Sequence, residues 1–187
     1  MTEAAPLLGP ARRRTPPAIG RMLRVDHAGE YGAVAIYQGQ QAVFRRGLHT
    51  RDMADELAAM EAEEQKHLDA FDALLVEHRT RPTLLLPVWK MMGYGLGVAT
   101  ALMGRRAAHL CTEAVETVIE EHYADQAVEA ELTHPDLAAT FREFREDELH
   151  HRDTAIAGGS QEAPLRAPLA RAIRAGCHAA IAVSERV

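Results

Sequence analysis

The sequence predicts an all-α protein: a four-helix bundle with one extra apolar helix and a C-terminal helix. Three observations predict this fold class. Apolar residues recur at alternating steps of three and four along four long segments, which is the spacing of a helix face. Turns that contain glycine or proline separate these segments. The 187 residues are enough for one domain with a full hydrophobic core. We expect a mobile tail at residues 1–20 and a single domain at 21–187.

Composition narrows the classes of function. The chain carries 27 acidic and 21 basic residues, a net charge of −6, so it has no general attraction for nucleic-acid phosphates. Cys111 and Cys177 form no C-x-x-C pattern, which disfavours a disulfide framework or a zinc–thiolate site. We expect two small buried thiols in a reducing compartment. The first 20 residues lack the continuous apolar core of a secretory signal peptide.

The first helix is predicted at about 21–46. Its stripe runs from Leu23 to Phe44 and includes one carboxylate, Glu30. Glycines at 29, 32 and 39 weaken this helix. We expect them to allow a neighbouring helix to approach closely.

The second helix is predicted at about 52–79. Glu64 and His67 lie within its otherwise apolar stripe, a costly placement unless something compensates the two groups. Residues three apart are neighbours on a helix surface, so both side chains share one face. Glu61 and Glu63 lie off the stripe, and we expect them to be solvated.

The segment 82–104 is apolar on all sides, with Lys90 as its only charge. The uncharged run after Lys90 is shorter than the roughly 20 residues that a membrane span needs. Trp89 beside Lys90, and Arg105 with Arg106 at the other end, are typical anchors of a helix at a membrane interface. We favour that interpretation, and an ordinary core helix is the main alternative.

The third and fourth helices are predicted at about 105–132 and 136–156. Glu116 lies on the stripe of the third, although Glu113 and Glu120 are one turn away. In the fourth helix two pairs have the same spacing. Glu148 and His151 align with Phe141 and Phe144, whereas Asp147 and His150 lie about 100° around the helix. Glu148 and His151 are therefore the candidate pair.

A final helix is predicted at about 164–185. Arg166, Arg171 and Arg174 stand among its apolar residues, so it would rest on a membrane surface or pack against the bundle.

Two lone glutamates and two Glu-x-x-His pairs thus follow one another in the order single, pair, single, pair. Inward-facing groups of this kind hold two metal ions in ferritin-like four-helix bundles. Four carboxylates would balance two divalent cations, and oxygen and imidazole ligands without thiolate suit iron or manganese. Any one of these elements arises easily by chance, but the whole set on apolar stripes does not. The candidate ligands are Glu30, Glu64, His67, Glu116, Glu148 and His151.

Four further residues lie near the expected site. Asp26, one turn before Glu30, would orient a ligand histidine from outside the ligand set. His27 and His122 are expected to be hydrogen-bonded structural histidines. Tyr123 either lines the site or belongs to the core. No G-x-G-x-x-G turn after a strand is present, so reducing equivalents would have to come from outside the chain.

Several motifs resemble one known family. The chain contains RVDHAGEYGA, EQKHL, RPTLLLPVW, ATALMG, CTEAVE, EEHY, FREDELHHRD and AGCHAAIAVSERV. From about residue 21 to the C-terminus it resembles the demethoxyubiquinone hydroxylases of ubiquinone biosynthesis. The resemblance implies a ferritin-like di-iron monooxygenase that hydroxylates the ring of a polyprenylated demethoxy-benzoquinone with O2 as co-substrate. It also implies NADH as the electron source.

The resemblance assigns a role to each ligand position. Glu30 and His67 would bind one iron ion, Glu116 and His151 the other, and Glu64 and Glu148 would bridge the two. These six residues are therefore the expected catalytic and metal-binding set.

The resemblance also implies partners and a location. We expect peripheral attachment to the cytoplasmic face of a bacterial cell membrane through 82–104 and the C-terminal helix. A homo-oligomer or a lipid-binding partner protein remains open. Two other functions compete: a ferritin-like protein that stores or detoxifies iron, and a metal-free helical scaffold at a membrane surface.

Overall fold

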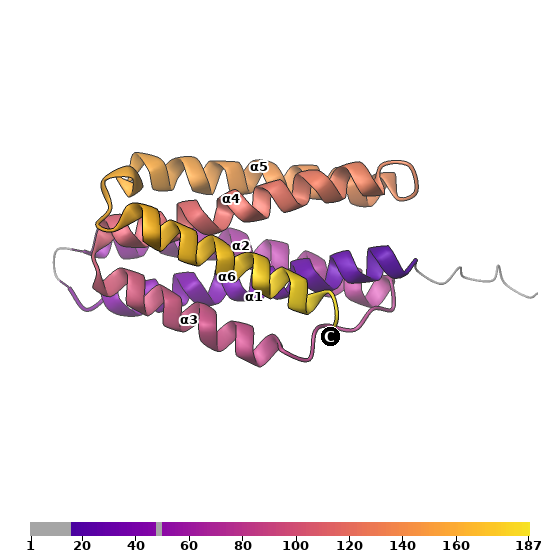
Figure 1. The fold of residues 1–187 in the computed structure, drawn as a ribbon, viewed down its shortest axis with the longest axis horizontal. Coiled ribbons are helices and arrows are strands. Elements are labelled where there is room, and N and C mark those ends of the chain that lie inside the picture. The colour runs from indigo at the N-terminus through magenta and orange to yellow at the C-terminus, as the bar shows by residue number, and fades with distance from the viewer. Residues whose placement is uncertain (1–15, 48–49) are drawn as a thin grey trace, which may run out of the picture.

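The computed structural model describes residues 16–47 and 50–187 and places every helix of this part of the chain in one bundle (Figure 1). The all-α prediction is confirmed, and the arrangement is a ferritin-like bundle with additional helices. In chain order the elements are α1 (Pro17–Phe44), α2 (Arg51–Glu77), α3 (Leu86–Leu102), α4 (Arg105–Ala130), α5 (Pro135–Ala157), a 3-10 turn η1 (Ser160–Glu162) and α6 (Arg166–Ser184).

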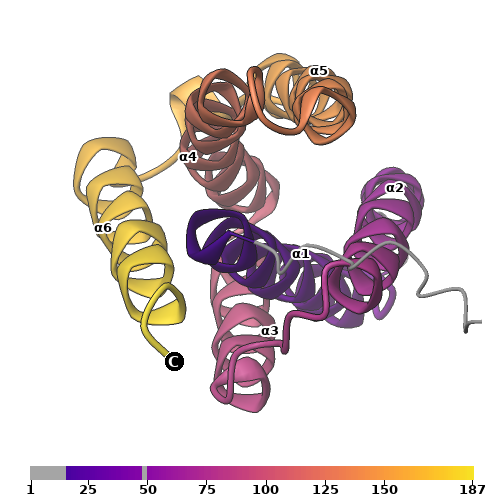
Figure 2. The same cartoon turned by 90° about the vertical axis from the view of Figure 1, so that its right-hand side faces the viewer.

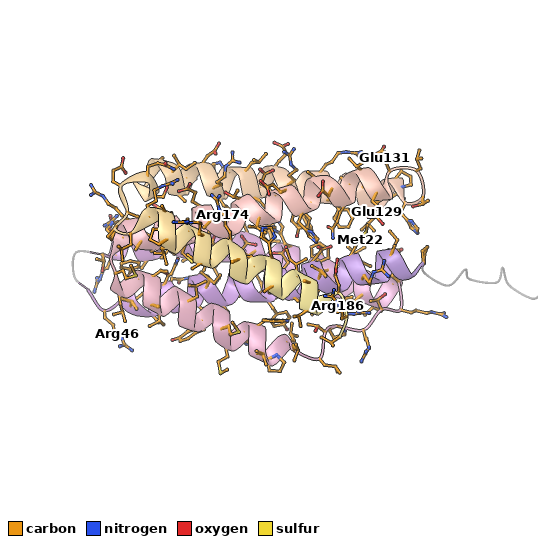
Figure 3. The ribbon with its side chains drawn as sticks, in the orientation of Figure 1. Met22, Arg46, Glu129, Glu131, Arg174 and Arg186 are labelled. Atoms are coloured by element: carbon orange, nitrogen blue, oxygen red, sulfur yellow. The ribbon has the colours of Figure 1, made fainter. Side chains whose placement is uncertain are left out.

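The bundle proper consists of two helical hairpins, α1–α2 and α4–α5, which Figure 2 shows end-on. The other two helices lie outside it: α3 packs along α1, and α6 packs on α4 and α1. Charged side chains occupy the outside of the bundle, as Arg46, Glu131 and Arg186 do in Figure 3.

Helix α1 begins earlier than expected. The predicted tail reached residue 20, but the helix starts at Pro17 and Ile19 is buried in the core. Proline is well suited to the first helical position, because its missing N–H would have no partner there anyway. The rest of the predicted tail, residues 1–15, lies outside the described residues.

Two apolar layers fill the bundle, one towards each end. The layer near the start of α1 contains Leu23, Phe71 and Phe141, all fully buried. The layer near the end of α1 contains Phe44 and Met53. Because the candidate ligands fall between these two layers along each helix, the bundle keeps a dry polar centre.

Helices α1 and α3 run parallel and touch backbone to backbone. An added Cβ at Gly97 would lie 2.1 Å from the Ile36 carbonyl oxygen, and one at Gly93 would lie 2.6 Å from that of Gly32. At Gly39 it would lie 2.3 Å from the Tyr94 carbonyl oxygen. The expected close approach is confirmed for positions 32 and 39.

Helix α3 buries only its small inner face against α1, so the core-helix alternative is wrong for it. Its buried residues are Gly93, Gly97, Thr100 and Ala101. Its outer side exposes large apolar side chains: Val88, Met91, Met92, Tyr94 and Leu102. None of the helices in the described ranges combines the length and hydropathy needed to cross a membrane.

Helix α6 packs on the bundle through Ala170 and Ile173, in line with the second of the two expectations for it. Arg166, expected to face a membrane, instead reaches inward and donates to Glu113 Oε1 at 2.6 Å. The contact fixes the start of α6 to α4.

Candidate metal centre

Six side chains from four helices meet at the middle of the bundle, and all of them are buried. One group comprises Glu30, Glu64, His67 and Glu148, and the other comprises Glu64, Glu116, Glu148 and His151. Within each group one potential ligand atom per residue lies within 4.8 Å of the others. Glu64 and Glu148 belong to both groups and therefore lie between two candidate positions.

The donor atoms fit divalent cations because they face one another without hydrogen-bond partners among the described residues. His67 Nδ1 lies 3.2 Å from a Glu148 oxygen and 3.7 Å from a Glu30 oxygen. His151 Nδ1 lies 3.0 Å from a Glu64 oxygen. Both Nδ1 atoms, and buried oxygens of Glu30, Glu64 and Glu148, make no hydrogen bond. Buried charges of this kind are normally paired or coordinate a metal.

Each histidine is held from behind by an acidic residue of the opposite hairpin. His67 Nε2 on α2 bonds Asp147 Oδ2 on α5 at 3.1 Å. His151 Nε2 on α5 bonds Glu63 Oε2 on α2 at 2.7 Å. A carboxylate at Nε2 keeps the proton on that nitrogen and leaves the Nδ1 lone pair free for a metal.

The expectation for Glu63 as merely solvated is therefore wrong, and Asp147 has a role although its pairing with His150 is not used. His150 is exposed. One signal was available in the sequence: an acidic residue directly precedes the glutamate of both Glu-x-x-His pairs.

Two buried tyrosines complete the polar centre. Tyr37 on α1 donates to Glu116 on α4 at 2.9 Å, and Tyr123 on α4 donates to Glu30 on α1. Burial and the adjacent carboxylates raise the pKa of both phenols, so both remain protonated donors. Tyr123 thus lines the site. Each tyrosine stands two turns after a lone glutamate and bonds the other one.

The charges of the metal-free cluster are balanced by protons. Burial raises the pKa of Glu30 to about 7, with His67 opposing the shift and Glu64 adding to it. Burial and then Glu148 and Glu64 raise the pKa of Glu116. Burial alone would lower the pKa of His151, but the surrounding carboxylates outweigh it and raise that pKa to about 12. The centre therefore holds protons where cations would otherwise stand.

The competing acidic residues are occupied elsewhere. Glu113 accepts from Arg166 and Gln161, and Glu120 accepts from Arg145 and Arg152. Neither reaches the cluster of donor atoms. Glu116 is therefore the lone glutamate of α4 that joins the centre.

Asp26 does not orient a ligand histidine, which corrects that expectation. Its Oδ1 accepts from Gln126 at 2.9 Å and lies 3.4 Å from His122 Nε2. His27 bonds Asp72 at 2.8 Å. Both histidines thus have structural partners, as predicted.

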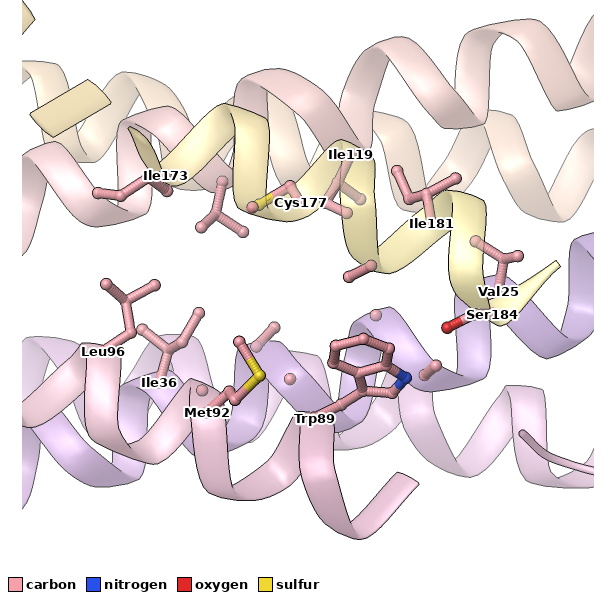
Figure 4. A pocket seen from close by; sticks show the side chains of 18 of the residues that line it. Val25, Ile36, Trp89, Met92, Leu96, Ile119, Ile173, Cys177, Ile181 and Ser184 are labelled. Atoms are coloured by element: carbon pink, nitrogen blue, oxygen red, sulfur yellow. The ribbon is translucent and has the colours of Figure 1, made fainter. Parts of the chain in front are cut away.

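An apolar cavity of about 360 Å³ lies beside the polar centre, enclosed by α1, α3, α4 and α6 (Figure 4). Gly29 and Ala33, which flank Glu30 in α1, line it. Val115 and Ile119 flank Glu116 in α4 in the same way. The cavity therefore adjoins the centre on the side of the two lone glutamates, away from the histidines.

Known proteins resemble this chain over nearly its whole length. The family described as ubiquinone biosynthesis protein COQ7 matches residues 17–184. A 3-demethoxyubiquinol 3-hydroxylase of Rhodospirillum rubrum is 48% identical over 169 residues, covering 90% of this chain and 78% of that protein. The mouse NADPH-dependent 3-demethoxyubiquinone 3-hydroxylase is 42% identical with the same coverage, and the yeast 5-demethoxyubiquinone hydroxylase is 38% identical over 90% of this chain and 78% of its own length.

Proposed function

The chain belongs to the ubiquinone biosynthesis protein COQ7 family, and we propose on that basis that it hydroxylates the ring of a polyprenylated demethoxy-benzoquinone with O2. The observation that carries the proposal is a buried six-residue carboxylate–histidine centre beside an apolar cavity. An iron-storage protein would need the first feature but not the second. Membership of this family also favours the hydroxylase.

We assign two iron ions to the centre. Glu30 and His67 would hold one, Glu116 and His151 the other, and Glu64 and Glu148 would bridge both. When bound, iron supplies the activation of O2 that hydroxylation of a ring carbon requires.

The protein's own contribution is to hold and shield this centre. Asp147 and Glu63 fix the two imidazole rings, and Tyr37 and Tyr123 fix the lone glutamates. Phe144 stacks on the His67 ring at 4.2 Å between centroids and helps to exclude water.

The cavity would bind the quinone ring and the first part of its tail. Its walls are apolar, and it adjoins Glu30 and Glu116. The remainder of the tail would leave between α3 and α6. Relatives named NADPH-dependent suggest a reduced nicotinamide nucleotide as the electron source, and an assay with NADH and NADPH in parallel decides between them.

The exposed side of α3 would lie on the membrane that contains the substrate, on the cytoplasmic face of a bacterial cell membrane. Met91 and Leu102 are 70% and 72% exposed on this side. Arg171 and Arg174 on α6 supply positive charge for anionic lipid. A second copy of the chain or a lipid-binding protein is the competing occupant of this surface.

The test is restoration of ubiquinone in a strain that lacks its own hydroxylase, with the demethoxy precursor measured in parallel. The wild-type chain should restore ubiquinone. Glu148→Ala should leave the precursor accumulated at unchanged helical content, whereas Glu146→Ala, exposed on the same helix, should behave as wild type. Restoration by Glu148→Ala would contradict the proposal.

A further inference from the structure

The apolar cavity has one polar end. Trp89 on α3 and Ser184 on α6 both line the cavity, and Figure 4 shows the indole nitrogen and the serine hydroxyl directed towards the same end, beside Val25. The Ser184 side chain is buried. Trp89 Nε1 is also buried and has no hydrogen-bond partner within the part of the chain that the structure describes.

A buried N–H without an acceptor is unfavourable, and tryptophan in such a place normally finds a partner. The surrounding walls offer none, because the other lining residues of this end are apolar. A bound molecule that carries an oxygen acceptor would supply it. Pockets for small molecules commonly have this form, with apolar walls and a few placed polar groups that fix orientation.

The register of α1 and α3 shows where this end lies relative to the metal centre. Gly97 faces Ile36 and Gly93 faces Gly32. Because the two helices run parallel, one further turn back brings Trp89 opposite Ala28. Ala28 belongs to the same turn of α1 as Glu30. A ring that contacts Trp89 therefore lies over the turn that carries a candidate ligand.

We propose that Trp89 positions the substrate ring: its Nε1–H donates a hydrogen bond to a ring oxygen, and the Ser184 hydroxyl makes a second polar contact. The proposal rests on the proposed function, since it takes a quinone as the occupant. An indole N–H only donates, whereas a hydroxyl donates or accepts, so the pair suits both the quinone and the quinol. The two contacts orient the ring, and the apolar walls hold the tail.

The chain has a single tryptophan, so its fluorescence reports this position alone. The probe is a 2-methoxy-5-methyl-1,4-benzoquinone with a short prenyl tail, and the control ligand is a benzene with the same tail and no oxygen. We expect the quinone to quench the emission of the wild-type protein in step with binding measured by calorimetry. Binding without quenching would overturn the proposal.

The hydrogen bond itself is tested with Trp89→Phe, which keeps an aromatic ring and removes the N–H. In calorimetry the variant should lose roughly three- to tenfold in affinity for the quinone and little for the oxygen-free ligand. Ser184→Ala should show a smaller loss of the same kind. Met92→Leu, which alters only an apolar part of the lining, should change both affinities alike. A structural role for Trp89 would lower both affinities together.

The outcomes separate this proposal from the proposed function. If the wild-type protein binds and hydroxylates the quinone while Trp89→Phe keeps the full preference for it over the oxygen-free ligand, only the role of Trp89 is refuted. If the wild-type protein binds neither quinone nor quinol, both proposals fall. Thermal unfolding of each variant shows whether the fold is retained.

Discussion

Replacing Glu63 by alanine tests the crossed support of the metal centre. Glu63 lies on α2, but it bonds His151 on α5. If the six residues bind metal as proposed, the change should weaken the cation held by His151 although it lies on the other hairpin. Removal of such outer carboxylates typically lowers metal affinity by about 10- to 100-fold.

The magnitude follows from the exposure of Glu63. A hydrogen bond to a charged group contributes about 1.5–3 kcal/mol. The Glu63 side chain is 45% exposed, so solvent screening reduces this to about 1–2 kcal/mol. Since about 1.4 kcal/mol corresponds to a tenfold change, we expect affinity to fall between roughly fivefold and thirtyfold. The lower part of the typical range is therefore expected.

The assay is an anaerobic titration with Co(II), whose absorption bands report each occupied position, followed by iron retention against a chelator. Asp147→Ala should have the same effect on the position held by His67. Asp55→Ala and Glu146→Ala, exposed on α2 and α5, serve as controls. Wild-type affinity in Glu63→Ala at unchanged helicity would refute the crossed support.

Three further predictions follow from the structure. Because the pKa of Glu30 is raised from 4.5 to about 7, the metal-free folded state binds more protons than the unfolded chain in that interval; its unfolding temperature should fall as pH rises through it, and saturating Mn(II) should remove the slope. Gly97→Ala should cost about 1–3 kcal/mol in chemical denaturation by forcing α3 from α1, whereas Gly95→Ala, with open space around its Cβ, should stabilise by about 0.5–1 kcal/mol; equal effects would contradict the packing account. Met91→Glu should reduce sedimentation with anionic vesicles, and Leu132→Glu at the far end of α4 should not; retained binding of Met91→Glu would exclude α3 as the docking side.

The helices and the set of converging side chains could be predicted from the sequence because both depend on short-range periodicity. A glutamate or histidine within an apolar stripe must point inward, and that is how Glu64 and His67 stood out from the other acidic residues. The start of α1 was missed because proline appeared to end the ordered chain, although it suits a first helical turn.

The residues that support the ligands could not be found in this way. Glu63 and Asp147 lie off their own stripes and face a histidine of another helix, a relation that depends on how two hairpins cross. Asp26 shows the converse error: it is one turn from Glu30 in sequence, but its partners His122 and Gln126 lie on α4. Helical periodicity reports direction, not the neighbour that is met there.

The two outer walls of the cavity differ in how firmly they are attached. On one side, glycine contacts join the backbone of α3 directly to that of α1, so any displacement of α3 would carry Glu30 with it. On the other side, α6 is tied at its start by Arg166 and Glu113, and further along Gly176 has free space around it. A bulky lipid can therefore be admitted most cheaply by a swing of the far end of α6 about that tie, which leaves the geometry of the reacting centre undisturbed.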